Sequence, residues 1–526
     1  MFISKRLILG LACTALCAAF AGCGGGGSSS GGSYNPVNPT VSGNYLFQVG
    51  SLSSDYTATM LVSSTSTASE NIELSVNTPT VAKASEAAEA KTDEAEGIGP
   101  HDFTNILAEK FRPEADRVAL NAKINGKPDF KTNTKYTDCA KDDTVEIYVY
   151  KNLRNLTKID VKKVVDNSET SSVLVFSEIL NDGSTIISHD KALEIDEVFG
   201  TNNIYHKNGA PIAKTVRSTF GKEFSPGIDG TDKIIIFVLQ SSTIGNGVYG
   251  YFNGADEYPT NESSSSNEGE ILYVNGDIDD YDLYSTIGHE FQHMCSYNQK
   301  VILDGAYSGE MEKSSVNEGR SVLAEDLCGF SLKGSDGEGE TCNTYILQCA
   351  SSYLNTPEDV SFSEFNNTNG EYGGNYLLQR YVADRFGISV ITDAATNTDT
   401  GLDNVANAAG IPFRQLFADF GVANLVSNLN GADKIYNYKA ISLTEAYGDN
   451  SKKLGHAEPA SVVINNASNI ARATVQPYSN SYYSFRCSSA ASNLQVGLTA
   501  PSSTSVSKMA LLGPNGLNKL LDAIKQ

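Results

Sequence analysis

Two histidines separated by three residues, with a glutamate beside the first, form the pattern with the clearest chemistry. His289, Glu290 and His293 read His-Glu-x-x-His within a stretch that favours a helix. Two imidazoles four residues apart lie one turn apart on one helix face and can hold a zinc ion. The glutamate between them can reach a water molecule on the open side of the metal. The pattern therefore predicts a zinc-dependent hydrolase of peptide bonds.

The alternative is a chance match on a solvent-facing helix. The chain has only 6 histidines, and Leu283, Ile287 and Phe291 recur at helical spacing around the motif. This periodicity predicts a buried helix. Burying two imidazoles and a carboxylate without partners is costly, whereas a bound metal removes that cost. The zinc site is therefore the favoured interpretation.

A second helix is expected to supply the third ligand. Zinc in hydrolases usually has three protein ligands, and the set of two histidines and a glutamate is one of the common ones. Glu318 lies on a predicted helix, Ser314–Leu327, which leaves enough chain after His293 for a turn between the two helices. No further histidine occurs before His456. The alternative for Glu318 is a solvated helix carboxylate, and other third ligands would be Glu310, Glu312 and Glu325.

The two motifs together resemble a known family. His289–Met294, followed by Asn317–Gly319 and Ala324–Leu327, is similar to the hyicolysin-type zinc metallopeptidases, which are gluzincins with a thermolysin-like zinc site. The resemblance implies His289, His293 and Glu318 as zinc ligands and Glu290 as the general base. It extends, more weakly, over residues 140 to 430. Val316 departs from the pattern, because relatives often carry Trp there.

Four further residues are candidates for roles at this site. Tyr372 and Tyr376, one helical turn apart, are candidate donors to the oxyanion of the reaction, by position and by resemblance. The alternative is that both tyrosines only pack. Glu325 and Asp326 are candidates to orient a ligand histidine. Glu325 is the better one, because it is seven residues from Glu318 and lies on the same helix face.

The first residues predict export and a lipid anchor. A basic start, an apolar run at 7–20 and the sequence Phe-Ala-Gly-Cys at 20–23 resemble a bacterial lipobox. The resemblance implies a signal peptide over residues 1–22, a lipid on Cys23 and a Gly/Ser-rich tether over 23–42. The expected location is the bacterial cell envelope, at the outer membrane or the cell surface. The alternative is an ordinary secretory signal.

Composition limits the partners and cofactors. The formal net charge of −23 disfavours nucleic acid and anionic lipid as partners. Protein or peptide substrates, and a membrane reached through Cys23, are the expected partners. One catalytic zinc ion is the expected cofactor. Calcium at the acidic loops 229–232 or 277–282 has little support, because their spacing does not match an EF-hand loop and a solvated acidic turn is favoured.

Six cysteines follow the signal and lipobox. An even count in an exported chain permits three disulfides, with 15 pairings. Cys342 and Cys349 flank a short segment and are candidates for a local pair. The six are Cys139, Cys295, Cys328, Cys342, Cys349 and Cys487.

The pattern of elements predicts an α+β fold. We expect a thermolysin-like zinc peptidase of two lobes, a mixed sheet lobe and a helical lobe, flanked by small β domains. The strand before the catalytic helix, 270–275, is a candidate edge for binding an extended peptide, and 515–525 looks helical. The expected parts are a small β unit at 43–79, a linker or propeptide-like segment at 80–135, the peptidase domain at 136–435 and a β-rich domain at 436–526.

The favoured function is a membrane-tethered zinc endopeptidase that acts on extracellular or periplasmic proteins. The main alternative is a catalytically silent surface binding protein or adhesin that keeps the fold, against which the intact Glu290 argues. The ligands alone do not exclude metal-dependent hydrolysis of a non-peptide ester or amide.

Overall fold

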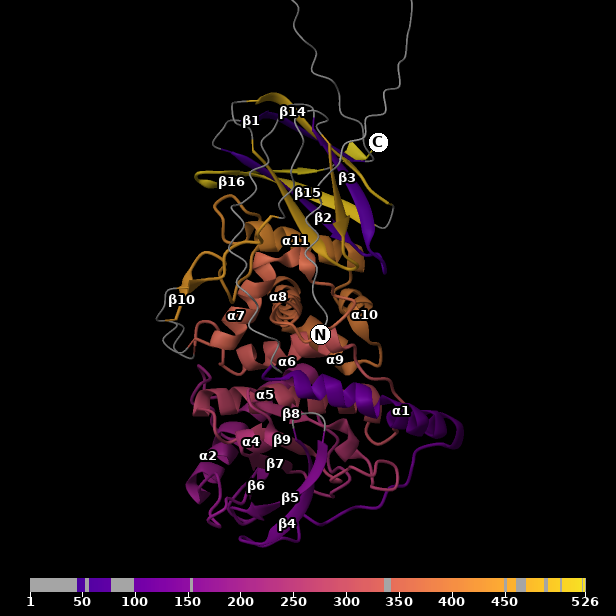
Figure 1. Ribbon diagram of the computed structural model, residues 1–526, viewed down its shortest axis with the longest axis vertical. Helices are drawn as coiled ribbons and strands as arrows, with labels where there is room; N and C mark the ends of the chain where they lie inside the picture. Colours follow the sequence, from indigo (N-terminus) through magenta and orange to yellow (C-terminus); the bar gives the residue numbers. More distant parts are fainter. Residues whose placement is uncertain are drawn as a thin grey trace, which may run out of the picture. The chain divides into compact units, whose positions relative to one another are not determined.

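The structure is a computed structural model (Figure 1) that describes residues 45–52, 56–76, 99–151, 155–334, 342–448, 452–459, 470–486, 491–501, 504–522 and 524–525. The expected signal peptide, the tether with Cys23 and the cysteine Cys487 lie outside these residues. The described part is a mixed α/β structure, as the sequence predicts. None of its helices combines the length and apolar composition that a membrane crossing needs.

A six-stranded mixed sheet supports the helix that carries the His-Glu-x-x-His motif. Its order is β4-β5-β6-β7-β9-β8, with β6, β7 and β9 parallel and β8 antiparallel to β9. The central strand β7 is the apolar run IIIFVL and is buried throughout, as a strand covered on both faces must be. The strands are β4 (Thr144–Lys151), β5 (Asn155–Lys163), β6 (Val173–Glu178), β7 (Ile234–Leu239), β8 (Gly250–Phe252) and β9 (Ile271–Asn275).

The edge of this sheet differs from the prediction. The strand expected at 270–275 is β9, which lies between β7 and β8 and has no free side. The short strand β8 takes the edge position instead. The sequence predicts the strand that became β9 but not the three-residue strand β8, and the order of strands depends on a connection that local patterns do not encode.

Helices cover the sheet and continue beyond it (Figure 1). Helix α5, which carries the His-Glu-x-x-His motif, follows β9 after a short turn, and α6 and α8 pack next to one another. The helices are α1 (Asp102–Asn125), α2 (His189–Gly200), α3 (Ile212–Phe220), α4 (Ser241–Ile244), α5 (Asp280–Tyr297), α6 (Ser314–Leu327), α7 (Thr344–Asn355), α8 (Asn369–Phe386), α9 (Ile388–Thr396), α10 (Gly401–Ala408) and α11 (Phe413–Val426). Short 3₁₀ turns lie at Gly254–Glu257, Pro357–Asp359 and Lys434–Tyr436, and a π turn at Asn298–Ile302 extends α5.

Helix α1 belongs to the stretch for which the sequence predicts a linker or propeptide-like segment. Phe103, Leu107 and Phe111 recur at helical spacing and are buried. The helix packs against β8 and the 3₁₀ turn Gly254–Glu257 (Figure 1). Residues 102–125 are therefore an ordered part of the described structure, and their N-terminal end approaches the catalytic helix.

The two β-rich ends of the chain share their sheets instead of forming separate units. One sheet has the order β12-β3-β14-β1-β17 and the other β13-β2-β15-β16, so each combines strands from both ends. Their facing sides bury apolar residues such as Phe47, Met60 and Val496. The strands are β1 (Tyr45–Leu52), β2 (Thr57–Ser64), β3 (Glu70–Val76), β12 (Ile470–Val475), β13 (Asn480–Arg486), β14 (Ala491–Thr499), β15 (Thr504–Gly513), β16 (Gly516–Asp522) and β17 (Ile524–Lys525). A separate two-stranded sheet pairs β10 (Ala446–Tyr447) with β11 (Lys452–Lys453).

The helix expected at 515–525 is wrong. Residues Gly516–Asp522 form β16, which pairs with β15 through a tight turn. Gly516 has φ of +108° at this turn, a conformation that favours glycine and ends any helical path. The Pro-Asn-Gly sequence at 514–516 is a turn signal that outweighs the weak helical pattern after it.

The local disulfide between Cys342 and Cys349 is also wrong, since both residues are free thiols here. The other cysteines of the described part, Cys139, Cys295 and Cys328, are free as well. Cys295, Cys328 and Cys349 are buried and behave as small apolar side chains.

Candidate metal centre and catalytic site

Helix α5 presents the motif from a buried position. Asp279 caps the helix by accepting a hydrogen bond from the backbone N–H of Asp282 at 3.0 Å. Every residue from Leu283 to Tyr297 is buried, so the helix is packed on all sides. His289 and His293 lie on one face, with ring centroids 5.0 Å apart. The helix thus holds both imidazoles in the relation that one metal ion needs.

Helix α6 brings Glu318 to the same place. Its Oε2 lies 3.2 Å from Nε2 of His289, and its Oε1 lies 3.3 Å from Nε2 of His293. One ligand atom from each of the three residues falls within 4.8 Å of the others. The three ligands expected from the sequence therefore lie together, on two neighbouring helices.

The electrostatics of this group fit a divalent cation. Burial opposes the charge of Glu318, yet the charge of His293 and hydrogen bonds to the imidazoles hold its pKa at about 2. Burial also opposes a charged His289, but its contacts with Glu318 and Glu325 raise its pKa to about 10. Both shifts have the same cause, because a buried carboxylate needs a positive neighbour. A zinc ion would supply that charge, and two imidazole nitrogens with one carboxylate are donors that zinc prefers.

Glu325 orients one ligand histidine. Its Oε1 lies 2.7 Å from Nδ1 of His289, while Oε2 accepts hydrogen bonds from Ser285 at 2.6 Å and Asn343 at 3.1 Å. A carboxylate on Nδ1 leaves Nε2 facing Glu318 and fixes the ring. Asp326 lies elsewhere, since its carboxylate accepts hydrogen bonds from Tyr376 and Arg380.

Glu290 is buried beside the ligands without joining them. Its Oε2 accepts a hydrogen bond of 2.8 Å from Thr104, and its Oε1 lies 3.2 Å from Nδ1 of His101. Burial opposes its ionisation, but the contact with His101 and the nearby ligand imidazoles lower the pKa of Glu290 below its ordinary value. The side chain is therefore a carboxylate that can accept a proton next to the candidate metal position.

The two candidate tyrosines separate in the structure. The Tyr372 hydroxyl donates to Oδ1 of Asp102 at 3.2 Å, and the negative charges of Glu318 and Glu290 act on it. The Tyr376 hydroxyl donates to Oδ2 of Asp326 at 2.9 Å. Tyr372 thus faces the metal centre, whereas Tyr376 belongs to the polar group around Asp326.

The N-terminal turn of α1 brings residues to the centre that the sequence did not indicate. The ring of His101 stacks on that of His289, with centroids 3.8 Å apart and planes at 12°. Asn105 donates a hydrogen bond of 2.6 Å to Oε1 of Glu318. His101, Thr104 and Asn105 are all buried. The scarcity of histidine is the one signal that could have drawn attention to His101, because the chain has only 6 histidines.

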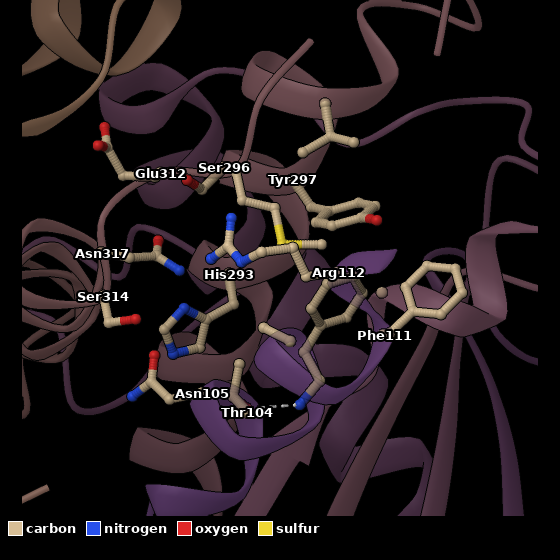
Figure 2. A pocket seen from close by; sticks show the side chains of 15 residues that line it. Thr104, Asn105, Phe111, Arg112, His293, Ser296, Tyr297, Glu312, Ser314 and Asn317 are labelled. Atoms are coloured by element: carbon tan, nitrogen blue, oxygen red, sulfur yellow. Dashed lines mark hydrogen bonds between the residues drawn. The ribbon is translucent and has the colours of Figure 1, made fainter. Parts of the chain in front are cut away.

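A small cavity lies beside this turn (Figure 2). Its volume is about 40 Å³, which suffices for water but not for a peptide. Residues of α1 form one wall, and His293, Ser296 and Tyr297 of α5 form the opposite one. Ser314 and Asn317 of α6 also line the cavity. The candidate catalytic side chains His289, Glu290 and Glu318 are fully buried, so the candidate centre is closed in the described structure.

Comparison with known proteins agrees with a metallopeptidase. No family model matches the chain. The chain is 21% identical over 327 residues to the neutral metalloprotease ShpI of Staphylococcus hyicus, a match that covers 59% of this chain and 67% of the relative. This distant homology to a neutral metalloprotease supports a metal-dependent hydrolase.

Proposed function

We propose that the chain is a zinc-dependent endopeptidase of the hyicolysin type, with a thermolysin-like arrangement of sheet and helical lobes. The observation that carries the proposal is the group formed by two imidazoles and the Glu318 carboxylate, with their ligand atoms within 4.8 Å of one another. Glu290, on the same helix as the imidazoles, adds a base. The distant relation to a neutral metalloprotease supports the same reaction class.

His289, His293 and Glu318 would hold the zinc ion, which when bound supplies a Lewis acid that polarises water and the scissile carbonyl. Glu290 would accept a proton from the attacking water and return it to the departing amine. The contact with His101 and the nearby imidazoles lower the pKa of Glu290, which favours its carboxylate form, and Thr104 donates a hydrogen bond that orients it. Tyr372 is the better placed of the two tyrosines to donate a hydrogen bond to the oxyanion.

The substrate would bind as an extended strand along β8. This strand is the edge of the six-stranded sheet, and Gly250 lets it pass close to the catalytic helix. A Cβ at Gly250 would lie 2.5 Å from Cγ2 of Thr286 and 3.4 Å from Cγ of Glu290. A peptide paired with this edge would thus have its backbone next to the base.

A lipid anchor at Cys23 and a place in the bacterial cell envelope remain proposals from the sequence. The lipobox-like residues before Cys23 and the Gly/Ser-rich stretch after it support them. Replacing Cys23 with Ser should move the protein from the detergent phase to the aqueous phase in phase partitioning. Unchanged partitioning would exclude the anchor.

The test of the proposed function is metal-dependent proteolysis. We expect one zinc ion per chain by metal analysis, together with cleavage of unfolded casein that a chelator abolishes and added zinc restores. A protein without stoichiometric zinc would refute the zinc centre. Zinc without cleavage of any protein or peptide would favour the silent binding protein, and cleavage restricted to small esters or amides would favour the non-peptide hydrolase.

A further inference from the structure

Three acidic side chains gather in the interior, away from the residues assigned to catalysis. Asp229 lies in the loop before β7, Glu257 ends the 3₁₀ turn Gly254–Glu257, and Glu270 immediately precedes β9. All three are at most 2% exposed. The solvated acidic turn favoured by the sequence for loop 229–232 is therefore wrong for Asp229, which is buried at 1% exposure.

Glu270 links the other two. Its carboxyl lies within hydrogen-bonding reach of the carboxyls of both Asp229 and Glu257. Each of the three still has one buried oxygen without a hydrogen-bond partner: Oδ2 of Asp229, Oε2 of Glu257 and Oε2 of Glu270. Buried acceptors without partners are costly, so this cluster needs either protons or a cation.

The charges around the cluster do not balance it. The neighbouring charges that act on Glu257 come from Asp229, Asp256 and Glu223, all of them acidic. Burial and this repulsion raise the pKa of Glu257 to about 8, and burial raises the pKa values of Asp229 and Glu270 as well. Buried acidic groups that lack basic partners either become neutral by binding protons or coordinate a metal ion.

The backbone is shaped to admit the central carboxyl. A Cβ at Gly227 would lie 1.3 Å from Oε1 of Glu270, so any other residue there would displace it. The backbone N–H of Ile228 donates to the same Oε1 at 3.3 Å. Gly269 likewise lies close to the free oxygen of Asp229, with 3.4 Å from its Cβ position to Oδ2.

The chemical type of the three donor groups and the distances between their oxygens decide which ion fits. All three are carboxylates, which suit hard cations such as Ca²⁺ better than zinc. In the described part of the chain, only the two histidine-containing groups have all ligand atoms within 4.8 Å, so this cluster is wider than the zinc centre. Oxygens on opposite sides of Ca²⁺ are roughly 5 Å apart, since each Ca–O distance is 2.3–2.6 Å.

We propose that Asp229, Glu257 and Glu270 bind a structural calcium ion that joins the loop before β7, the 3₁₀ turn and the start of β9. The ion would take up the three unpartnered oxygens. Because β9 leads directly into α5, calcium at this position would stabilise the support of the catalytic helix without contacting substrate.

The test is thermal unfolding of the zinc-loaded protein, freed of calcium by a calcium-selective chelator. Saturating Ca²⁺ should raise the unfolding temperature by about 5 °C, the shift expected for an ion well above its Kd, and Mg²⁺ should do much less. Tb³⁺, a luminescent substitute for Ca²⁺, should bind and be displaced by Ca²⁺. Tyrosine would sensitise its emission, because Tyr307 donates to the backbone of Glu257 at 2.9 Å and the chain has no Trp.

The matched variants are Glu257→Gln and Glu270→Gln, with the exposed Glu310→Gln as control. Both cluster variants should lose the response to Ca²⁺ and, without Ca²⁺, should be about as stable as the unsubstituted protein, because each puts a neutral amide where burial and the acidic neighbours already favour the protonated carboxyl. Glu310→Gln should respond normally. If Ca²⁺ leaves the unsubstituted protein unchanged and fails to displace Tb³⁺, or if the cluster variants respond fully, the carboxyls share protons and the proposal fails.

A second feature, the segment Gly99–Asn105, fills the place that a substrate needs. The backbone N–H of Tyr249 donates to the carbonyl of Pro100 at 2.9 Å, and that of Phe252 donates to Oγ1 of Thr104 at 3.0 Å. Tyr249 immediately precedes the edge strand β8, and Phe252 is its last residue. An extended peptide would require the same donors.

The same segment occupies the catalytic groups. Thr104 and His101 contact Glu290, Asn105 contacts Glu318, and Asp102 accepts the hydrogen bond of Tyr372. Thr104 and Asn105 also help to line the small cavity beside His293 (Figure 2). With this segment removed, the base, the candidate oxyanion donor and the strand edge would all face one open groove.

We infer that Gly99–Asn105 is an autoinhibitory plug and that the described structure is the latent form of the enzyme. The inhibitory effect of this segment rests on the proposed peptidase function, whereas its contacts with the buried side chains do not depend on that function. The plug is held by hydrogen bonds to catalytic side chains, so weakening those bonds should open the site.

The test compares the double variant His101→Ala/Asn105→Ala with Ile124→Ala, which changes an exposed residue of the same helix. In the double variant, a chelator should remove zinc at least about tenfold faster, as expected if the loss of two buried hydrogen bonds favours opening by 1.4 kcal/mol or more. Hydrolysis of a small peptide should rise in parallel. Ile124→Ala should change neither rate.

The outcomes separate the plug from the peptidase function. Faster zinc removal without hydrolysis of any peptide would support the plug and count against the peptidase. Lower hydrolysis with unchanged zinc removal would overturn the plug and make the segment part of the catalytic machinery. Loss of folding in the double variant would be resolved with Thr104→Val, which keeps the shape of the side chain and removes one hydrogen bond to Glu290, and for which the same two rates decide.

Discussion

Glu290→Gln should reduce peptide hydrolysis by roughly 10² to 10⁴-fold, the range for losing a general base, while zinc stays bound. The amide fits the same space and can still accept a hydrogen bond from Thr104, but it cannot take a proton from water. The measurements are kcat/KM for a peptide and zinc content by metal analysis. An active Glu290→Gln enzyme would remove Glu290 from the reaction.

Glu318→Gln is the matched variant, because it makes the same change from carboxylate to amide in a side chain proposed as a zinc ligand instead of the base. Its amide is a poorer ligand and removes a negative charge from the centre, so zinc affinity should fall and excess zinc should partly restore activity. Excess zinc should not restore Glu290→Gln. If both variants hold zinc equally well, Glu318 is not the third ligand. Glu325 would then be tried first, because Glu310 is exposed and Glu312 pairs with Arg320.

Gly319→Ala should reduce hydrolysis by about 10²-fold or more and weaken zinc binding, although alanine favours helices. A Cβ at Gly319 would lie 2.7 Å from the backbone oxygen of Asn375 and 2.8 Å from its carbonyl carbon. Backbone atoms of α8 cannot move aside as a side chain can, so α6 must shift and carry Glu318 away from the imidazoles. The measurements are the zinc Kd, kcat/KM and the unfolding temperature.

Gly288→Ala is the control for this prediction. Gly288 is likewise the direct neighbour of a candidate ligand, His289, within a buried helix, but its Cβ would meet only Ile212 Cγ2 at 3.7 Å and Cys328 Sγ at 3.8 Å. These are ordinary contacts, so the substitution should leave zinc binding intact and stabilise the helix by up to about 1 kcal/mol. Equal behaviour of Gly288→Ala and Gly319→Ala would show that the close approach of α6 and α8 does not position Glu318.

Local spacing was enough to predict the helices that carry the candidate ligands. His289 and His293 are related by one helical turn, and the apolar face of Ser314–Leu327 indicates a second helix that can present Glu318. The pairing of Glu325 with His289 follows from the same periodicity. These features depend on contacts within one helix or between helices that are close in sequence.

Features that depend on contacts between residues far apart in the sequence could not be predicted from local spacing. Thr104 and Glu290 are 186 residues apart, and Asn105 and Glu318 are 213 apart, so no periodicity connects them. The order of β8 and β9 and the cluster around Glu270 were not predicted for the same reason, because each depends on where a loop returns to the sheet. The residues before Gly99 are acidic and alanine-rich, which favours a linker. The predicted linker was extended over the residues that form α1.

Each of the two terminal sheets combines strands from both ends of the chain, and this has a consequence for how the chain folds. Strand β2 pairs with β13 and β15, and β1 and β3 both pair with β14, so partners are separated by about four hundred residues. During synthesis, the first three strands have unpaired edges until the C-terminal strands are available, while the intervening part of the chain can fold as a loop between them. Long-range pairing of this kind is slow and leaves edges open to aggregation. The ends of the chain therefore close the fold as a late step, and a cut in β13–β15 would leave the earliest strands without partners.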